Sequence, residues 1–309
     1  GGYARGDRRR PAVAADSAQC RHRKAFSVYF SHVPKTGTSF LATLYRWGCN
    51  VSPNNNSFEL SPDPSKLASH NKLWKTLPIT PDCSPRLYLP ENNDLMGESP
   101  FYAMGVKDPH EAVPLGPNDV HHVVQVFRDP AERTLSQYEY QRREQTCEKQ
   151  VERGIDVSKC YATKAKRFAE YVNSSVYKYY QLRATAGFYC RDKIDDAEML
   201  MKRAEKRIRR YAFVGITERF NESVVLFHLM FGGCINEKQF ANMRPTGYQV
   251  YSCPEGSPCP SNFYNIGRNF VTREEQRIYD IAMEIFESKA IEYGLYDRTR
   301  NPWYGMLYD

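Results

Sequence analysis

One stretch near the N-terminus constrains the fold of this chain most strongly: residues 26–47, which read FSVYFSHVPKTGTSFLATLYRW. A short run dense in Phe, Val and Tyr indicates a buried β-strand, and Leu41, Leu44 and Tyr45 follow at helical spacing. The polar turn 34–39 lies between them. The first backbone N–H groups of a helix lack partners and carry the positive end of its dipole. The turn therefore predicts a phosphate site.

The order of residues in this turn excludes the Walker A pattern of nucleotide triphosphatases. That pattern places a lysine directly after its second glycine and a Ser or Thr next to the lysine. Here Lys35 precedes Gly37. A strand-to-helix turn with a glycine and a solvated lysine also occurs without any ligand. The turn alone leaves both interpretations open, and a second motif is needed to decide.

The second motif begins with residues 121–127, HHVVQVF, which predict another buried strand. Arg128 stands at its end, and a helix is expected from Ala131 to about Lys149. Asp129 is the expected N-cap, with Pro130 at the first helical position.

Ser136 comes about two turns into this helix, on the face that the sequence assigns to Arg133 and Gln137. A guanidinium and a hydroxyl placed as in Arg128 and Ser136 suit a second phosphate at a distance from the first loop. Two such motifs, each following its own strand, predict a ligand with two separated phosphates.

Further elements alternate along the chain. A third strand is predicted over 212–217, and helices over 163–182, 196–210, 222–231 and from the capping pair Thr272 and Glu275 to Tyr293, before Gly294. Strands separated by helices predict an α/β fold: a three-layer domain with a mostly parallel sheet flanked by helices. The helix 196–210 carries a basic outer face, which is typical of a solvated helix surface.

Composition divides the chain into a basic stem, 1–24, and a folded domain, 25–309. The net charge is +7, but the first 24 residues hold seven Lys or Arg and two Asp, so most of the excess lies in the stem. No apolar run approaches the roughly 20 residues of a membrane helix. Because the sequence begins with Gly1 and Gly2 and no Met, we expect that a membrane anchor or a signal sequence has been removed upstream.

Nine cysteines and four glycosylation sequons favour an oxidising secretory compartment. Cys253 and Cys259 bracket a short loop that a disulfide is expected to close. The cysteines form no CxxC pair and lie away from histidines at ligand spacing. A metal site is therefore not expected.

Together, PKTGTS and RDPAERTLSQY resemble the sulfotransferases that use 3′-phosphoadenosine-5′-phosphosulfate (PAPS), and most closely the Golgi carbohydrate group that contains heparan sulfate 2-O- and 6-O-sulfotransferases. The resemblance implies a P-loop-like sulfotransferase fold. It also implies that one set of residues holds the 5′-phosphosulfate, namely Lys35, Thr36, Gly37, Thr38 and Ser39, and that Arg128 and Ser136 hold the 3′-phosphate.

Two later segments extend the resemblance. Residues 211–218, YAFVGITE, are similar to a third family block near the nucleotide. Residues 264–268, YNIGR, resemble a late loop that closes on the nucleotide through Arg268. Lys35 is expected to neutralise charge on the bridging oxygen of the phosphosulfate.

The resemblance also directs the search for a catalytic base, which typically contributes about 10²- to 10⁴-fold to the rate. The 2-O-like relatives have a histidine in a Gly-His segment upstream of the RDP strand. Here Glu98, in the segment MGESPFY, stands in its place. Other sulfotransferases use Glu as the base, so Glu98 is the first candidate and His110 the second.

The resemblance implies a Golgi enzyme: the soluble lumenal part of a type II membrane protein that sulfates a hydroxyl of an anionic glycan, with PAPS as co-substrate. It implies neither a nucleic-acid partner nor a metal. Two alternatives stay open. One is a tyrosylprotein sulfotransferase that accepts an acidic Tyr peptide, and the other a catalytically idle glycan-binding relative.

Overall fold

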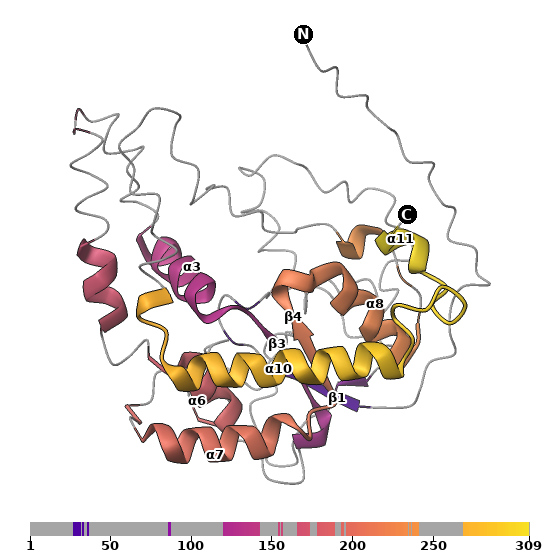
Figure 1. Ribbon diagram of the computed structural model, residues 1–309, viewed down its shortest axis with the longest axis horizontal. Helices are drawn as coiled ribbons and strands as arrows, with labels where there is room; N and C mark the ends of the chain where they lie inside the picture. Colours follow the sequence, from indigo (N-terminus) through magenta and orange to yellow (C-terminus); the bar gives the residue numbers. More distant parts are fainter. Residues whose placement is uncertain are drawn as a thin grey trace.

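A computed structural model describes residues 27–31, 33, 36, 86–87, 120–142, 154, 156, 166–173, 178–188, 193–194, 196–233, 235, 237–240 and 268–308. Several predicted features lie outside these residues: the stem 1–24, the helix after the first turn, and the Cys253–Cys259 loop. The described part is a mixed α/β structure, mostly helical, with a small parallel sheet packed against the helices (Figure 1).

The sheet has the strand order β2-β1-β3-β4, and every pairing is parallel. Its strands are β1 (Ser27–Ser31), β2 (Arg86–Leu87), β3 (Val123–Phe127) and β4 (Phe213–Ile216). All residues of β3 and β4 are buried. Near-continuous apolar runs are typical of parallel strands that are covered on both faces, and this burial explains why the two runs were readable in the sequence.

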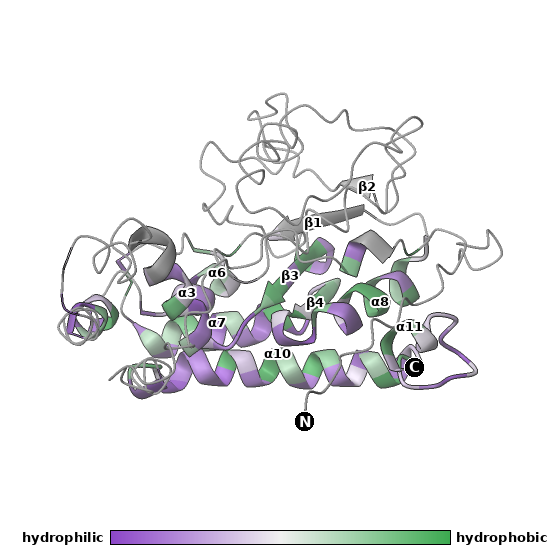
Figure 2. Cartoon of the chain, turned by 90° about the horizontal axis from the view of Figure 1, so that it is seen from above, coloured by the Kyte–Doolittle hydropathy of each residue, from purple (hydrophilic) through white to green (hydrophobic). Residues whose placement is uncertain are grey.

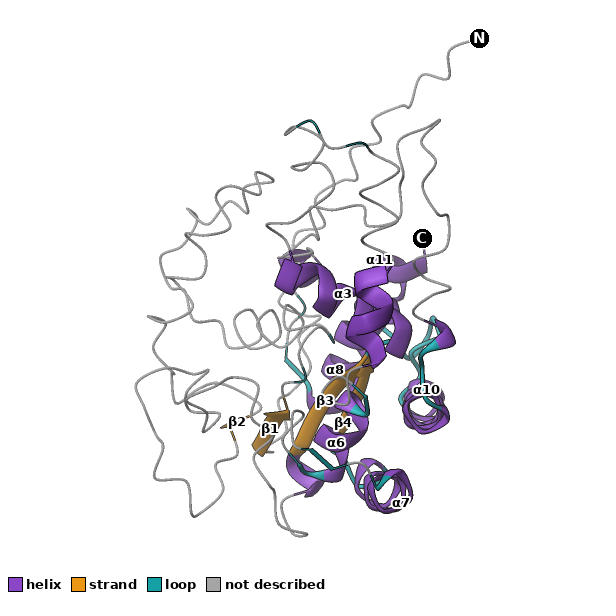
Figure 3. Cartoon of the chain, turned by 90° about the vertical axis from the view of Figure 1, so that its left-hand side faces the viewer, coloured by secondary structure: helices purple, strands orange, loops and turns teal. Residues whose placement is uncertain are grey.

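The main helices are labelled in Figure 1. They are α3 (Pro130–Arg142), α6 (Tyr180–Ala186), α7 (Ala197–Ile208), α8 (Phe220–Phe231), α10 (Arg273–Glu292) and α11 (Tyr304–Tyr308). Viewed nearly end-on, α7 and α10 lie side by side on one side of the strands (Figure 3). Both α8 and α10 contact β4.

The main core joins β3 and β4 to α6, α7, α8 and α10. Along α7 its members are the predicted stripe of Leu200, Ala204 and Ile208, each fully buried. Apolar and polar residues alternate along helix α10 (Figure 2), as expected for a helix with one face on a core. By contrast, α8 is buried over nine of its 12 residues.

The predicted starts of α3 and α10 are confirmed by their N-cap hydrogen bonds. The Asp129 carboxylate accepts a hydrogen bond from the backbone N–H of Glu132 at 3.0 Å, with Pro130 first in α3. The Thr272 hydroxyl accepts one from the N–H of Glu275 at 3.2 Å. Such caps satisfy donors that a helix start leaves unpaired, which fixes where α3 and α10 begin.

Two predicted elements are wrong in extent. His121 and His122 belong to a 3₁₀ turn, η3 (Val120–His122), and the strand begins only at Val123, where pairing with β1 starts. The expected helix 163–182 is interrupted. Helical residues 166–173 are separated from α6 by Tyr179, whose φ of 58° is left-handed. A right-handed helix does not continue through such a residue, so α6 starts afresh.

None of the described helices combines the length and the apolar character needed to cross a membrane.

Candidate functional site

The carboxyl ends of β1, β3 and β4 meet at one edge of the sheet, because the three strands are neighbours and run parallel. In open parallel sheets this edge is where ligands bind. Three loops leave the sheet here: the turn after β1, which contains Thr36; the Arg128 segment after β3; and η5 (Thr217–Arg219), which follows β4 directly. The two predicted phosphate motifs therefore start at the same edge.

Thr217 joins the first two of these loops. Its hydroxyl oxygen lies 2.7 Å from the carbonyl oxygen of Thr36 and 2.9 Å from that of Phe127. A hydroxyl at hydrogen-bonding distance from two backbone carbonyls fixes the spacing between the chains that carry them. The end of β4 thus holds the turn after β1 against the end of β3.

Thr36 is buried, and its side chain closes its own turn. The hydroxyl donates to the carbonyl oxygen of Val33 at 2.8 Å, and the Thr36 N–H points to the same oxygen at 3.4 Å. In this arrangement the Thr36 hydroxyl shapes the loop that it was predicted to share with a phosphate. Its contact with a phosphate stays a prediction.

The backbone of Arg128 is clamped by one side chain from another element. Gln181, fully buried in α6, accepts a hydrogen bond from the Arg128 N–H at 3.0 Å and donates its amide to the Arg128 carbonyl at 2.8 Å. This pair of hydrogen bonds satisfies both backbone polar groups of the first residue after β3. The last residue before α3 is therefore held in a defined orientation.

The side chain of Arg128 lies between two carboxylates. Its Nη2 is 3.2 Å from Glu132, one turn along α3, and its Nε is 4.0 Å from Glu218, beyond the end of β4. The Arg128 side chain is 20% exposed, and the two carboxylates are about one-third exposed. A cation at this edge of the sheet thus remains within reach of a ligand.

Glu218 connects the end of β4 to the start of α3. One carboxylate oxygen accepts the N–H of Asp129 at 3.0 Å, and the other accepts the hydroxyl of Tyr279, on α10, at 3.1 Å. Burial raises the pKa of Glu218, against the hydrogen bonds from Asp129 and Tyr279 and the charge of Arg128. Burial of this carboxylate therefore weakens its preference for the charged form.

The three polar residues that the sequence placed on one face of α3 have different surroundings. Arg133 and Gln137 are 2% and 5% exposed, whereas Ser136 is partly exposed. The Arg133 guanidinium stacks over the ring of Tyr180 at 4.8 Å. Arg133 and Gln137 therefore belong to the protein interior, and Ser136 is the member of the three with solvent access.

Arg268 is exposed in the helical turn 268–270, and its carbonyl accepts the N–H of Val271 at 3.2 Å just before α10 begins. The remaining predicted site residues lie outside the described part of the chain: Lys35, Gly37, Thr38, Ser39, Glu98 and His110. Of the predicted set, the structure brings the backbones of Thr36 and Arg128 together at one sheet edge.

Gln181 was missed by sequence reasoning. It lies inside a segment with a plain helical pattern, and α6, which carries it, begins only after the left-handed Tyr179, a break that periodicity does not reveal. Thr217 and Glu218 entered only as part of the third family block. Their position in the sequence could have identified them as site residues, because polar residues immediately after a buried parallel strand lie at the ligand-binding edge of the sheet.

Comparisons with protein-family models, with curated proteins and with solved structures found no match to this chain. Within the described residues, no group of three or more His, Cys, Asp or Glu side chains is placed to hold a metal ion. The functional interpretation therefore rests on the strand ends and the motifs that follow them.

Proposed function

We propose that this chain is a sulfotransferase that moves a sulfuryl group from PAPS to a hydroxyl of a glycan. The observation that carries the proposal is the hydroxyl of Thr217, which lies within hydrogen-bonding distance of the carbonyls of Thr36 and Phe127. The turn that contains Lys35 and the segment that begins at Arg128 therefore leave the sheet side by side. One ligand with phosphates on both sides of a ribose suits this arrangement, and ATP has no use for the second site.

In the proposed three-layer, P-loop-like sulfotransferase fold, the turn 34–39 holds the 5′-phosphosulfate with its backbone N–H groups, hydroxyls and Lys35. Arg128 and Ser136 hold the 3′-phosphate, and Arg268 closes over the nucleotide. The clamp from Gln181 supports this role of Arg128, because it fixes the backbone from which the guanidinium extends. A preorganised donor loses less entropy when it binds an anion.

The two carboxylates beside Arg128 are compatible with an anion site, because they partly neutralise the guanidinium when no ligand is bound. Glu132 and Glu218 supply weak, partly exposed partners at 3.2 and 4.0 Å. Partly exposed ion pairs contribute about 0–1 kcal/mol. A phosphate dianion offers Arg128 a bidentate, charge-assisted contact that is stronger than either.

In the proposed reaction, the acceptor hydroxyl oxygen attacks the sulfur while the bond from sulfur to the bridging oxygen breaks. The products are a sulfate ester and adenosine 3′,5′-bisphosphate. Glu98 takes the acceptor proton, with His110 as the second candidate, and Lys35 neutralises charge on the bridging oxygen. Positioning and charge neutralisation supply most of the acceleration in this kind of transfer.

The proposed acceptor is an anionic glycan in the Golgi lumen, reached by a type II membrane protein. The most useful experiment is transfer from labelled PAPS to a panel of glycans and acidic Tyr peptides. Lys35→Ala and Glu98→Gln are the paired variants. We expect transfer to a glycan hydroxyl by the wild type, and a loss of about 10²-fold or more in each variant.

Each other outcome of this experiment has a definite meaning. Transfer to Tyr peptides alone identifies a tyrosylprotein sulfotransferase instead. Nucleotide binding without any transfer points to the catalytically idle relative. If neither transfer nor binding of adenosine 3′,5′-bisphosphate occurs, the sulfotransferase proposal is wrong. Full activity in Glu98→Gln moves the base to another residue, with His110 tested next.

A further inference from the structure

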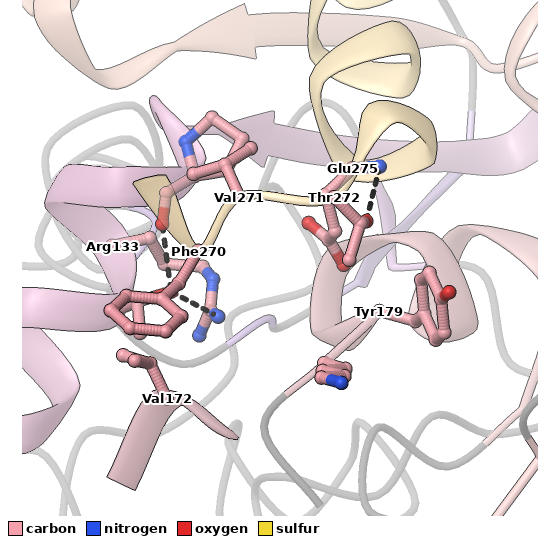
Figure 4. A pocket seen from close by; sticks show the side chains of 10 residues that line it. Arg133, Val172, Tyr179, Phe270, Val271, Thr272 and Glu275 are labelled. Atoms are coloured by element: carbon pink, nitrogen blue, oxygen red, sulfur yellow. Dashed lines mark hydrogen bonds between the residues drawn. The ribbon is translucent and has the colours of Figure 1, made fainter. Parts of the chain in front are cut away.

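A small cavity lies between the first turns of α3 and the start of α10, on the inner side of α3. It has a volume of about 20 Å³. Figure 4 shows that Arg133 reaches it from α3 and Glu275 from the first turn of α10, with Phe270 and Thr272 beside them. Three charged residues line this cavity: Arg133 and Glu275 are almost completely buried, and Lys178 is partly exposed.

Arg133 has donors that the surrounding residues leave unused. Its Nη2 donates to the hydroxyl of Thr134 at 3.0 Å, and its guanidinium lies over the ring of Tyr180. Its Nε and Nη1 are buried and find no hydrogen-bond partner within the described part of the chain. Buried donors in folded proteins nearly always have a partner, which is often an ordered water.

Glu275 has a buried acceptor that the surrounding residues leave unpaired. Its Oε1 accepts the N–H of Leu182 at 3.1 Å, while its Oε2 is buried and has no hydrogen-bond partner among the described residues. Burial raises the pKa of Glu275, and the charge of Arg133 is the strongest influence in the opposite direction. Oε2 of Glu275 is therefore not hydrogen-bonded to Nε or Nη1 of Arg133.

We propose that this cavity is a binding site for one ordered water molecule, which accepts a hydrogen bond from Arg133 and donates one to Oε2 of Glu275. An anion here would face the carboxylate of Glu275, and a cation would face the guanidinium of Arg133. A small neutral group that both donates and accepts satisfies both sides. The cavity volume admits about one water by the usual measure of roughly 10–15 Å³ per site.

This water connects α10 to the candidate site through a short path. Glu275 holds the N–H of Leu182, and the preceding residue, Gln181, clamps the backbone of Arg128. Arg133 lies on α3, the helix that starts at the same strand end. The bridged pair therefore fixes α3, α6 and α10 relative to one another around Arg128, and Arg133 and Glu275 act as positioning residues.

A crystal structure of the wild-type chain tests the water directly. We expect one density peak 2.7–3.2 Å from Glu275 Oε2 and from Nε or Nη1 of Arg133. A dry cavity, or a direct Arg133–Glu275 ion pair that fills it, would overturn the proposal. A second crystal soaked in bromide covers the anion alternative, because an anomalous peak in the cavity would identify an anion site instead.

Thermal unfolding of three variants tests the coupling: Arg133→Met, Glu275→Gln and the double variant. Each single change leaves one buried charge without its opposite, so we expect the midpoint to fall by on the order of 10 °C. The double variant removes both charges and should recover at least half of the summed loss. Arg273→Met and Glu274→Gln, at the same helix start, are matched controls expected to shift the midpoint little. Strictly additive losses would contradict the coupling.

The positioning role is read from the affinity for adenosine 3′,5′-bisphosphate, and this readout alone rests on the proposed function. Glu275→Gln should weaken binding roughly two- to thirtyfold, and the double variant should recover part of it. Unchanged affinity in Glu275→Gln would overturn the positioning role. If the wild type does not bind the nucleotide, the sulfotransferase proposal fails, while the crystal and the unfolding measurements still decide the water site.

Discussion

Two arginines follow neighbouring strands of the sheet, and their side chains have different contacts. Arg219, after β4, donates to Glu222 at 2.8 Å and to the hydroxyl of Tyr296 at 2.5 Å, and also pairs with Glu287. Its guanidinium lies over the ring of Phe286 at 4.9 Å. Arg128, after β3, has carboxylates at 3.2 and 4.0 Å.

The contrast separates a structural cation from a candidate ligand-binding one. The hydrogen bonds to Glu222 raise the pKa of Arg219 above its ordinary value. The same cluster holds the C-terminal segment, since the Tyr308 hydroxyl donates to Glu222 at 2.8 Å. An arginine so fully engaged has little left for a ligand. Around Arg128, Gln181 fixes the backbone, and the carboxylates of Glu132 and Glu218 lie 3.2 and 4.0 Å from the guanidinium.

The largest effect is expected from Arg128→Met. Loss of charge-assisted contacts to a phosphate should weaken binding of adenosine 3′,5′-bisphosphate about 10- to 150-fold. The unfolding midpoint should change by no more than about 3 °C, because the lost ion pairs are partly exposed. Titration calorimetry and thermal unfolding on one preparation measure both. A large loss of stability with unchanged affinity would make Arg128 the structural cation.

Arg219→Met should do the reverse. Removal of a guanidinium engaged by two carboxylates and a hydroxyl leaves several groups with fewer partners, so the midpoint should fall by about 5 °C. Affinity for the nucleotide should stay within about twofold of wild type. Arg210→Met, at an exposed position in the turn after α7, is the control for loss of one positive charge. Equal losses of affinity in the Arg128 and Arg219 variants would remove the distinction between them.

Thr217→Val tests the connection between the two motifs. The valine keeps the shape but removes the hydroxyl between the carbonyls of Thr36 and Phe127. The loss of about 1 kcal/mol of hydrogen bonding corresponds to roughly fivefold weaker nucleotide binding. Thr217→Ser restores the hydroxyl and should restore the affinity. A serine variant as weak as the valine variant would assign the effect to packing.

Glu132→Gln should strengthen binding by about two- to fivefold, because the phosphate no longer competes with this carboxylate for Arg128. The matched control is Glu205→Gln, which removes the same kind of i,i+4 pair at 3.2 Å with Arg209, on α7. That change should leave the affinity as it is. Weaker binding in Glu132→Gln would show instead that Glu132 orients Arg128 for the ligand.

The smallest effect concerns pH and Glu218. Its pKa in the folded chain is raised from the ordinary 4.5, so the folded state binds this proton more tightly than the unfolded state does. The resulting stability is present below about pH 4.5 and is lost as the pH rises through the raised pKa. The glutamine in Glu218→Gln does not titrate, so the variant does not lose this stability. The free energy of unfolding of the variant, relative to that of the wild type, should therefore rise from pH 4.5 to 7. A constant difference would contradict a raised pKa of the partly buried Glu218 carboxylate.

Much of the fold was readable because local signals and burial agree. The apolar runs of β3 and β4 and the caps at Asp129 and Thr272 lie where the sequence places them. The interrupted helix was not readable, because a tyrosine with a left-handed φ has no composition signal. The capping box also proved incomplete, since the Glu275 side chain bonds Leu182, 93 residues away, instead of turning back to its own helix start.

The candidate site also contains residues that the sequence predicts and residues that it does not. Arg128 follows a strand and carries its signal in the sequence. Gln181 and Glu275 act from other elements through contacts 53 and 93 residues apart in the chain. Sequence patterns report on neighbours along the chain, so they identify groups that would touch a ligand more readily than the buried groups that hold them.

The most direct test of the central claim compares two nucleotides on the wild-type chain by titration calorimetry. If the strand ends form a site for two separated phosphates, adenosine 3′,5′-bisphosphate should bind about 10- to 150-fold more tightly than adenosine 5′-monophosphate. This preference should disappear in Arg128→Met. Equal affinities for the two nucleotides, or a preference that survives in Arg128→Met, would contradict a 3′-phosphate site at the end of β3.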